Sequence, residues 1–255
     1  MEKLPSSINN NLIQGKYNQT DEEDQKISKV LTIANLIPKS KILTTLYSKI
    51  IQKSLSIPKI RIVCISDTHN YHSDLIIPKG DILIHAGDFT ENGSNFEFKN
   101  FNNWLGQLKG FSHKIVIGGN HDPILYSKLL TNCIYLHNKQ ICLFGYKIYG
   151  SAYKKIEKKF RDYIGSDIPS DVDILITHVP PYGYCDRIIN GKSVGSKSLA
   201  LNVVNRIKPI IHIFGHIHEG YGGDCVENTI FLNAAILNQD ARPYNLPIIF
   251  DLPCK

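Results

Sequence analysis

The chain has 255 residues, of which 42% are hydrophobic and 20% are charged. This balance excludes a largely disordered, collagenous or coiled-coil protein, and a chain of this length can bury a core that needs no disulfide or metal merely to fold. The formal net charge of +6 permits an anionic partner but is too small to indicate one.

Residues 1–59 form a predicted N-terminal extension, helical in large part, whose role the sequence does not indicate. Thr20 and Glu23 have the spacing of a capping box at a helix start. The segment 39–53 has apolar residues at four-residue spacing among lysines and contains no acid. We expect this stripe to pack on the main domain, and the alternative is a basic amphipathic helix that contacts a membrane surface.

Targeting signals and cysteine pairs are not apparent in the sequence. The first residues lack the apolar centre of a signal peptide, and no apolar run approaches the roughly 20 residues that span a bilayer. The six cysteines include no C-x-x-C pair. These features predict a cytoplasmic protein with reduced thiols.

From residue 60 to 255 the pattern is that of one domain built from alternating strands and helices. The clearest helix is predicted from Ser94 to Leu108, where Ser94 and Glu97 form a capping-box pair. Short apolar runs predict strands that helices bury on both faces, as in a layered α/β sheet. These runs are Arg61–Ser66, Asp81–His85, Lys114–Ile117, Ile141–Tyr149, Asp173–Thr177, Ile210–Phe214, Ile230–Leu232 and Ile248–Leu252.

Five of these runs are followed directly by polar residues that can bind a metal. In open α/β sheets, ligands bind at the carboxyl ends of the strands, so the five ends are expected to converge. Imidazole, carboxylate and amide donors without a thiolate suit Mn, Fe or Zn, with Co or Ni as further candidates. The residues are Asp67 and His69, Asp88, Asn120 with His121 and Asp122, His178, and His216 with His218.

The order of these motifs resembles that of the calcineurin-like metallophosphoesterases. It is D-x-H, G-D, G-N-H-D, a single H and G-H-x-H. Five longer segments are similar in sequence to the metallophosphoesterase-domain-containing (MPPED) branch of these proteins, namely ISDTHN, HAGDFT, GGNHD, THVPPYGYCD and FGHIHEGYG. The resemblance runs from about Arg61 to Pro253. It implies a four-layer α/β/β/α sandwich with mixed sheets, which differs from a purely parallel sheet.

The resemblance also implies a centre of two divalent metal ions, with manganese among the candidates, and assigns a ligand set to each. Asp88 would bridge the two ions. Asp67, His69 and His218 would hold the first ion, and Asn120, His178 and His216 would hold the second.

The implied reaction is hydrolysis of a phosphoric ester by in-line attack of a metal-bridging hydroxide. His121 is the expected general acid, and Asp122 is expected to bind the far nitrogen of its ring and set the tautomer. The branch favours small phosphodiesters such as cyclic nucleotides. The alternatives are a phosphomonoesterase or phosphoprotein phosphatase, a nuclease, which the small charge of the catalytic region disfavours, and a non-catalytic interaction scaffold.

Other polar residues near the motifs have a structural interpretation and a functional one. His85 and His212 lie inside apolar runs and are expected to be structural. His72 follows the first motif and is a weaker candidate for substrate contact. The residues that flank motifs could line a pocket or stabilise turns, and they are Asn70, Asp186 and Tyr221.

Overall fold

The computed structural model describes residues 58–153 and 165–255. The helix start predicted at Thr20 and the basic segment 39–53 lie outside these residues. The boundary near residue 59 and any membrane contact of the basic segment therefore stay predictions. In the described ranges, no helix combines the length and the apolar character that a bilayer crossing requires.

The described chain alternates strands with short helices. The strands are β1 Lys59–Ile65, β2 Ile82–His85, β3 His113–Val116, β4 Ile134–Tyr135, β5 Lys139–Leu143, β6 Tyr146–Ser151, β7 Ile174–Thr177, β8 Ile211–Phe214, β9 Gly222–Val226, β10 Thr229–Asn233 and β11 Ile248–Pro253. The α-helices are α4 Asn95–Gln107 and α5 Lys197–Asn202, and the shorter helical turns are η1 Tyr71–Asp74, η2 Ile124–Leu129, η4 Val203–Ile207 and η5 His218–Gly220.

The strands form two mixed sheets, one with the order β11-β1-β2-β3-β4 and one with the order β5-β6-β7-β8-β10-β9. Within each sheet the central strands are parallel. Antiparallel pairs lie at the edges, where β11 joins β1, β5 joins β6 and β9 joins β10. The mixed sheets confirm the fold that the family resemblance implies and correct the purely parallel sheet that the apolar runs alone suggest.

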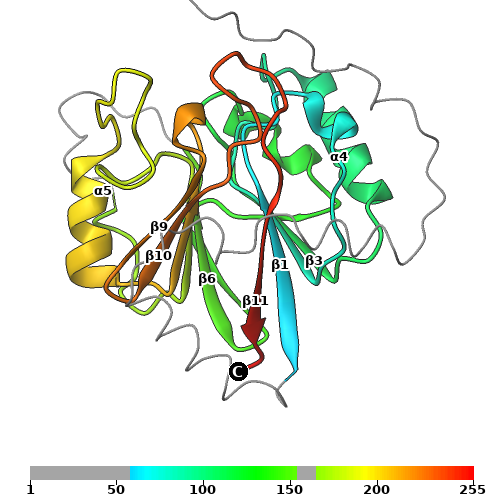
Figure 1. Ribbon diagram of the computed structural model, residues 1–255. Coiled ribbons are helices and arrows are strands. Elements are labelled where there is room, and N and C mark those ends of the chain that lie inside the picture. The colour runs from blue at the N-terminus through cyan, green and yellow to red at the C-terminus, as the bar shows by residue number, and fades with distance from the viewer. Residues whose placement is uncertain (1–57, 154–164) are drawn as a thin grey trace, which may run out of the picture. The chain divides into compact units, whose positions relative to one another are not determined.

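Three apolar clusters show that the sheets and helices form four layers. The first cluster joins side chains of both sheets, such as Ile62 and Ile176. The second places alternate residues of the first sheet, such as Val63, against α4. The third places the second sheet against α5 and η4, and Figure 1 shows α4 beside β1 and β3 and α5 beside β9 and β10. A strand buried on both faces reads as a continuous apolar run.

Helix α4 begins where the sequence predicts. The Ser94 hydroxyl accepts a hydrogen bond from the Glu97 amide at 3.3 Å, and the Glu97 carboxylate accepts one from the Ser94 amide at 2.7 Å. This reciprocal capping box satisfies amides that have no partner inside the helix. The predicted helix is therefore confirmed at its start.

The predicted strand from Ile141 to Tyr149 is wrong as a single element. The structure has a hairpin of β5 and β6, because Phe144 and Gly145 have φ values of 51° and 82° and turn the chain. Such left-handed conformations end a strand. Strands β4 and β9 have no counterpart among the predicted runs.

Candidate metal centre

The predicted ligands all follow strands at their carboxyl ends. Asp67 lies two residues beyond β1, Asp88 three residues beyond β2 and His178 directly after β7. Asn120 follows β3, and His216 follows β8. The first sheet therefore supplies the acids, the amide and the imidazole of His69, and the second sheet supplies the other imidazoles from the facing layer.

The backbone at the site is unusual. Asp67, His69, Asp88 and His216 have φ values of 53°, 39°, 55° and 69°. The left-handed region costs a side-chain-bearing residue about 1–2 kcal/mol, and such conformations gather at functional sites because the surrounding fold enforces them. The sharp turns let side chains from neighbouring strand ends face one another.

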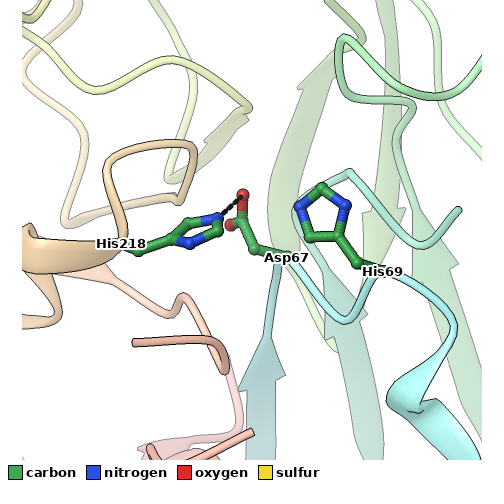
Figure 2. A group of neighbouring side chains, drawn as sticks. All are labelled: Asp67, His69 and His218. Carbon is green, nitrogen blue, oxygen red and sulfur yellow. Dashed lines mark ion pairs between the residues drawn. The ribbon is translucent and has the colours of Figure 1, made fainter. Parts of the chain in front are cut away.

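The first group of side chains is Asp67, His69 and His218. Figure 2 shows the Asp67 carboxylate at the end of β1, between the two rings. Its Oδ1 lies 3.4 Å from Nε2 of His218. The amide of His216 donates to the Asp67 carboxylate at 2.9 Å, so the acid also fixes the chain that carries His218.

The second group is Asp88, His178 and His216, and Asn120 joins it. Nε2 of His178 lies 3.1 Å from Oδ2 of Asp88 and 2.9 Å from Oδ1 of Asn120. The same Asp88 oxygen lies 3.8 Å from Nε2 of His69. Asp88 therefore stands between the two groups, as expected for a bridging ligand.

Two buried carboxylates at the centre are held ionised by imidazoles. Burial pushes the pKa of Asp67 upward, but the hydrogen bond from His218 and the charge of His178 outweigh it and hold that pKa well below its usual range. Burial likewise opposes the lowered pKa of Asp88, for which the charge of His178 is responsible. In return, and against burial, Asp88 raises the pKa of His178 to about 9.

The orientation of His178 fits a cation. Its Nδ1 lies 3.0 Å from the Ala86 carbonyl oxygen, which can only accept, so Nδ1 carries the proton of the neutral ring. Nε2 then directs a lone pair at the oxygens of Asp88 and Asn120, and three electron-rich atoms face one another. A proton or a metal ion must lie between them, and the donor set suits a divalent first-row metal.

His218 repeats this arrangement around the other buried acid. Its Nδ1 lies 3.3 Å from the carbonyl oxygen of Asn238 and its Nε2 faces Asp67. A main-chain carbonyl on Nδ1 leaves Nε2 as the ligand atom, which is the usual support of a metal-binding histidine. Both groups therefore fit the divalent metals that the sequence predicts.

Glycines leave room for the two acids. A Cβ atom on Gly215 would overlap Oδ2 of Asp67, and one on Gly119 would overlap Oδ1 of Asp88. Neither glycine has a positive φ, so close approach of the carboxylates is what requires them.

The predicted contact between Asp122 and the ring of His121 is wrong. Nδ1 of His121 lies 2.6 Å from the carbonyl oxygen of Glu91. Asp122 instead accepts hydrogen bonds from the amides of Thr90 and Gly119 at 3.0 and 2.8 Å. It also accepts from the Phe89 amide and the Thr90 hydroxyl, so it clamps the loop after β2 to the loop after β3.

His121 itself lies at the site, as predicted. Its amide donates to Oδ1 of Asp88 at 2.8 Å, and its ring packs edge-on against His69 with centroids 4.7 Å apart. The ring can therefore reach a group bound at the centre without being needed as a ligand.

Glu91 is a residue near the site that the sequence did not indicate, and Tyr153, whose ring packs against those of His178 and His216, is another. Oε2 of Glu91 lies 2.9 Å from Nδ1 of His69, close enough for an ion pair although the atoms are not aligned for a hydrogen bond. Together with His121, these residues form a third group that could hold a metal. The available signal for Glu91 was its position three residues after Asp88, which is weak in a polar loop.

The buried histidines outside the motifs are packed as structural groups. Nε2 of His85 lies 3.0 Å from the hydroxyl of Thr68, and Nε2 of His212 lies 2.9 Å from that of Thr177. His72 is fully buried against aromatic rings, so the weaker interpretation of it as a substrate contact is wrong.

The residues that flank the motifs stabilise loops. Asn70 donates to Glu97, and Tyr221 donates through its hydroxyl to the carbonyl oxygen of Leu246. The fully buried Asp186 accepts from two loop amides, those of Gly183 and Gly195. The turn interpretation therefore describes the contacts of all three.

Comparisons with known proteins place the chain in a phosphoesterase family. The family model for calcineurin-like phosphoesterases matches residues 60–220. The human metallophosphoesterase domain-containing protein 1 is 38% identical over 238 residues, which cover 76% of this chain and 71% of the human protein. The UPF0046 protein T07D4.2 of Caenorhabditis elegans is 38% identical over 239 residues, which cover 76% of this chain and 60% of the worm protein.

A solved structure is also similar at a lower level. The conserved uncharacterized protein of Streptococcus pneumoniae TIGR4, titled a predicted phosphoesterase, has 17% sequence identity and a TM-score of 0.41, and the match covers 77% of this chain and 85% of that one.

The chain belongs to the calcineurin-like phosphoesterase family. The family consists of phosphoester hydrolases that use divalent metals, and the two groups of candidate ligands agree with that chemistry. Belonging to the family confirms the expected hydrolase class.

Proposed function

We propose that the protein is a phosphodiesterase for small phosphodiesters, with cyclic nucleotides as the first candidates, and that it holds two divalent ions. The observation that carries the proposal is the position of Asp88. One oxygen of this acid faces an imidazole of each group, His178 at 3.1 Å and His69 at 3.8 Å. The proposed ligands are Asp67, His69 and His218 for one ion, Asn120, His178 and His216 for the other, and Asp88 for both.

When bound, such a pair of ions neutralises the phosphate and activates a water for in-line attack. The chain supplies the proton for the leaving oxygen through His121. The Glu91 carbonyl oxygen accepts a hydrogen bond from Nδ1 of that ring. Nδ1 therefore keeps its proton, and Nε2 is the nitrogen that exchanges one. The protonated ring then donates from Nε2 to the leaving oxygen as general acid.

The charged and imidazole groups that the described residues place at the centre support the choice of a diester over a monoester. Each ion pair that the described residues form at the centre joins a carboxylate to an imidazole. Sites for the doubly charged phosphomonoesters commonly add arginine or lysine, which bind phosphate oxygens as fixed cations. A phosphodiester carries one negative charge and needs less compensation beyond that of the ions.

A substrate panel tests the proposal. Protein supplemented with Mn²⁺, Zn²⁺ or Fe²⁺ is assayed against a bis-aryl phosphodiester, an aryl phosphomonoester, 2′,3′- and 3′,5′-cyclic nucleotides and a single-stranded oligonucleotide, and kcat/KM is compared. We expect the diesters to be hydrolysed at least tenfold more efficiently than the monoester. The Asp88→Asn variant should lose this activity, and the exposed Asp240→Asn should keep it.

Three results would overturn the proposal. The first is that no diester is hydrolysed and the Asp88→Asn variant behaves like the wild type, which would indicate a non-catalytic interaction scaffold. The second is a preference for the monoester, which would indicate a phosphatase. The third is activity confined to the oligonucleotide, which would indicate a nuclease.

A further inference from the structure

One loop residue contacts two imidazoles of the centre. Glu91 lies between β2 and α4, three residues after Asp88. Its carboxylate oxygen Oε2 lies 2.9 Å from Nδ1 of His69, and its main-chain oxygen lies 2.6 Å from Nδ1 of His121. The two contacts use different groups of Glu91, so a substitution removes the first and leaves the second in place.

A second acid holds this loop in position. The carboxylate of Glu97, at the start of α4, accepts hydrogen bonds from the amides of Glu91, Asn92 and Ser94 at 3.2, 3.0 and 2.7 Å. It also accepts from the Asn70 side chain at 2.5 Å. Although burial opposes ionisation, these bonds lower the pKa of Glu97 to about 2. The loop is therefore tied to the helix, and the position of Glu91 follows from it.

His69 differs from His178 and His218 in the group that supports its ring. Nδ1 of His178 and Nδ1 of His218 face main-chain carbonyl oxygens. Nδ1 of His69 faces the carboxylate of Glu91 instead. A carboxylate at this nitrogen favours the tautomer with the proton on Nδ1, and it raises the donor strength of Nε2, which faces Asp88.

We infer that Glu91 is a positioning residue that fixes the tautomer and the orientation in which His69 offers Nε2 to a divalent cation. The inference rests on the proposed role of His69 as a ligand. Because Glu91 acts through His69, its loss should weaken cation binding while the proton donor His121 keeps its main-chain partner.

The test compares Glu91→Ala and Glu91→Gln with the wild type. Removing such a partner typically weakens metal affinity 10- to 100-fold, so we expect Glu91→Ala to raise the Kd for Mn²⁺ by that factor in calorimetric titrations of metal-free protein. Glu91→Gln keeps an acceptor oxygen and should recover part of the affinity. The matched control is Glu219→Gln, which removes an exposed carboxylate next to His218.

A second readout does not depend on metal or activity. Nitrogen-15 NMR of the metal-free protein reports which ring nitrogen of His69 carries the proton, with the signal assigned from a His69→Gln variant. The wild type should show Nδ1 protonated, and Glu91→Ala should show a mixture of tautomers. Glu219→Gln should match the wild type in both measurements.

The inference fails if folded Glu91→Ala retains both the wild-type Kd for Mn²⁺ and the wild-type tautomer of His69. It also fails if Glu219→Gln weakens binding as much as Glu91→Gln, since the effect would then be one of net charge. The proposed function is judged separately, because the substrate panel can fail while the titration and the NMR signals still respond to Glu91.

Discussion

Asp122→Asn separates two roles for this acid, a clamp between loops and a partner of His121. In the structure each carboxylate oxygen of Asp122 accepts two hydrogen bonds. Oδ1 takes the amide and the hydroxyl of Thr90, and Oδ2 takes the amides of Phe89 and Gly119. The Asn side chain has the same shape but one acceptor oxygen. If its amide group faces Thr90, the Thr90 hydroxyl can accept from it and donate to the carbonyl oxygen of His121 at 2.8 Å, so the Thr90 amide is the donor that loses its acceptor.

The size of the effect follows from these contacts. Leaving a buried donor without an acceptor costs about 1–3 kcal/mol, and the amide group of Asn should turn toward Thr90, where one donor is lost rather than two. We therefore expect Asp122→Asn to lower the free energy of unfolding by about 2 kcal/mol. For a protein of this size that corresponds to a fall in Tm of roughly 4–8 °C.

Urea unfolding in a chelating buffer measures this loss without a contribution from metal. Activity is measured on the same variants at saturating Mn²⁺ between pH 5 and 9. The exposed Asp240→Asn serves as control for the loss of one negative charge and should unfold like the wild type. The shape of the pH profile should not change in Asp122→Asn, because the His121 ring is bound to Glu91 rather than to Asp122.

The opposite pattern would refute this reasoning. If Asp122→Asn unfolds like the wild type but loses kcat at least 100-fold with a shifted pH profile, Asp122 acts through His121 after all. The loop contacts would then be incidental to its function.

Three further predictions concern space and protons. Gly215→Ala should weaken Mn²⁺ binding at least tenfold by calorimetry, because the added methyl group would overlap the Asp67 carboxylate. Unchanged affinity would contradict the close approach of Gly215 to that carboxylate. Burial lowers the pKa of His72 to about 4 from about 6.5 in the unfolded chain, so the unfolding free energy should fall as the pH drops from 6.5 to 4. Urea unfolding of His72→Leu should show a smaller fall, and an equal fall would assign the effect to other groups. Although burial opposes it, the charge of Asp88 raises the pKa of His178 to about 9, so Mn²⁺ binding to the metal-free protein at pH 7 should release about one proton. Calorimetry in buffers of different ionisation enthalpy measures this release, and no release would show that His178 is not a ligand.

The candidate site could be predicted from the sequence because polar residues follow the apolar strands in a regular order. Asp67, Asp88 and His178 each lie within three residues of the end of an apolar strand, and the topology places the carboxyl ends of those strands together. Helix α4 was equally readable because Ser94 and Glu97 form a local capping pair. Both signals are local in the chain, and neither needs knowledge of the partner layer.

The remaining features depend on contacts that are distant in sequence. The antiparallel pairing of β11 with β1 joins opposite ends of the catalytic region, and no periodicity in either strand records it. Asp122 stands next to His121 in the chain, but neighbouring side chains point in different directions, and most of its partners lie across the fold in the loop after β2. Glu91 is an acid in a polar loop, so its contact with His69 was visible only once the loop was placed.

The left-handed backbone at Asp67 and Asp88 also has a consequence for how this family can change over time. Glycine adopts that conformation without steric cost, and asparagine and aspartate adopt it more often than most other residues, so few residue types fit these two positions. The two carboxylates also stabilise the folded chain, because Asp67 contacts His218 and Asp88 contacts His178. We expect Asp67→Asn or Asp88→Gly to lower the unfolding free energy of the metal-free protein, so that a lineage that lost either acid would lose stability together with metal binding.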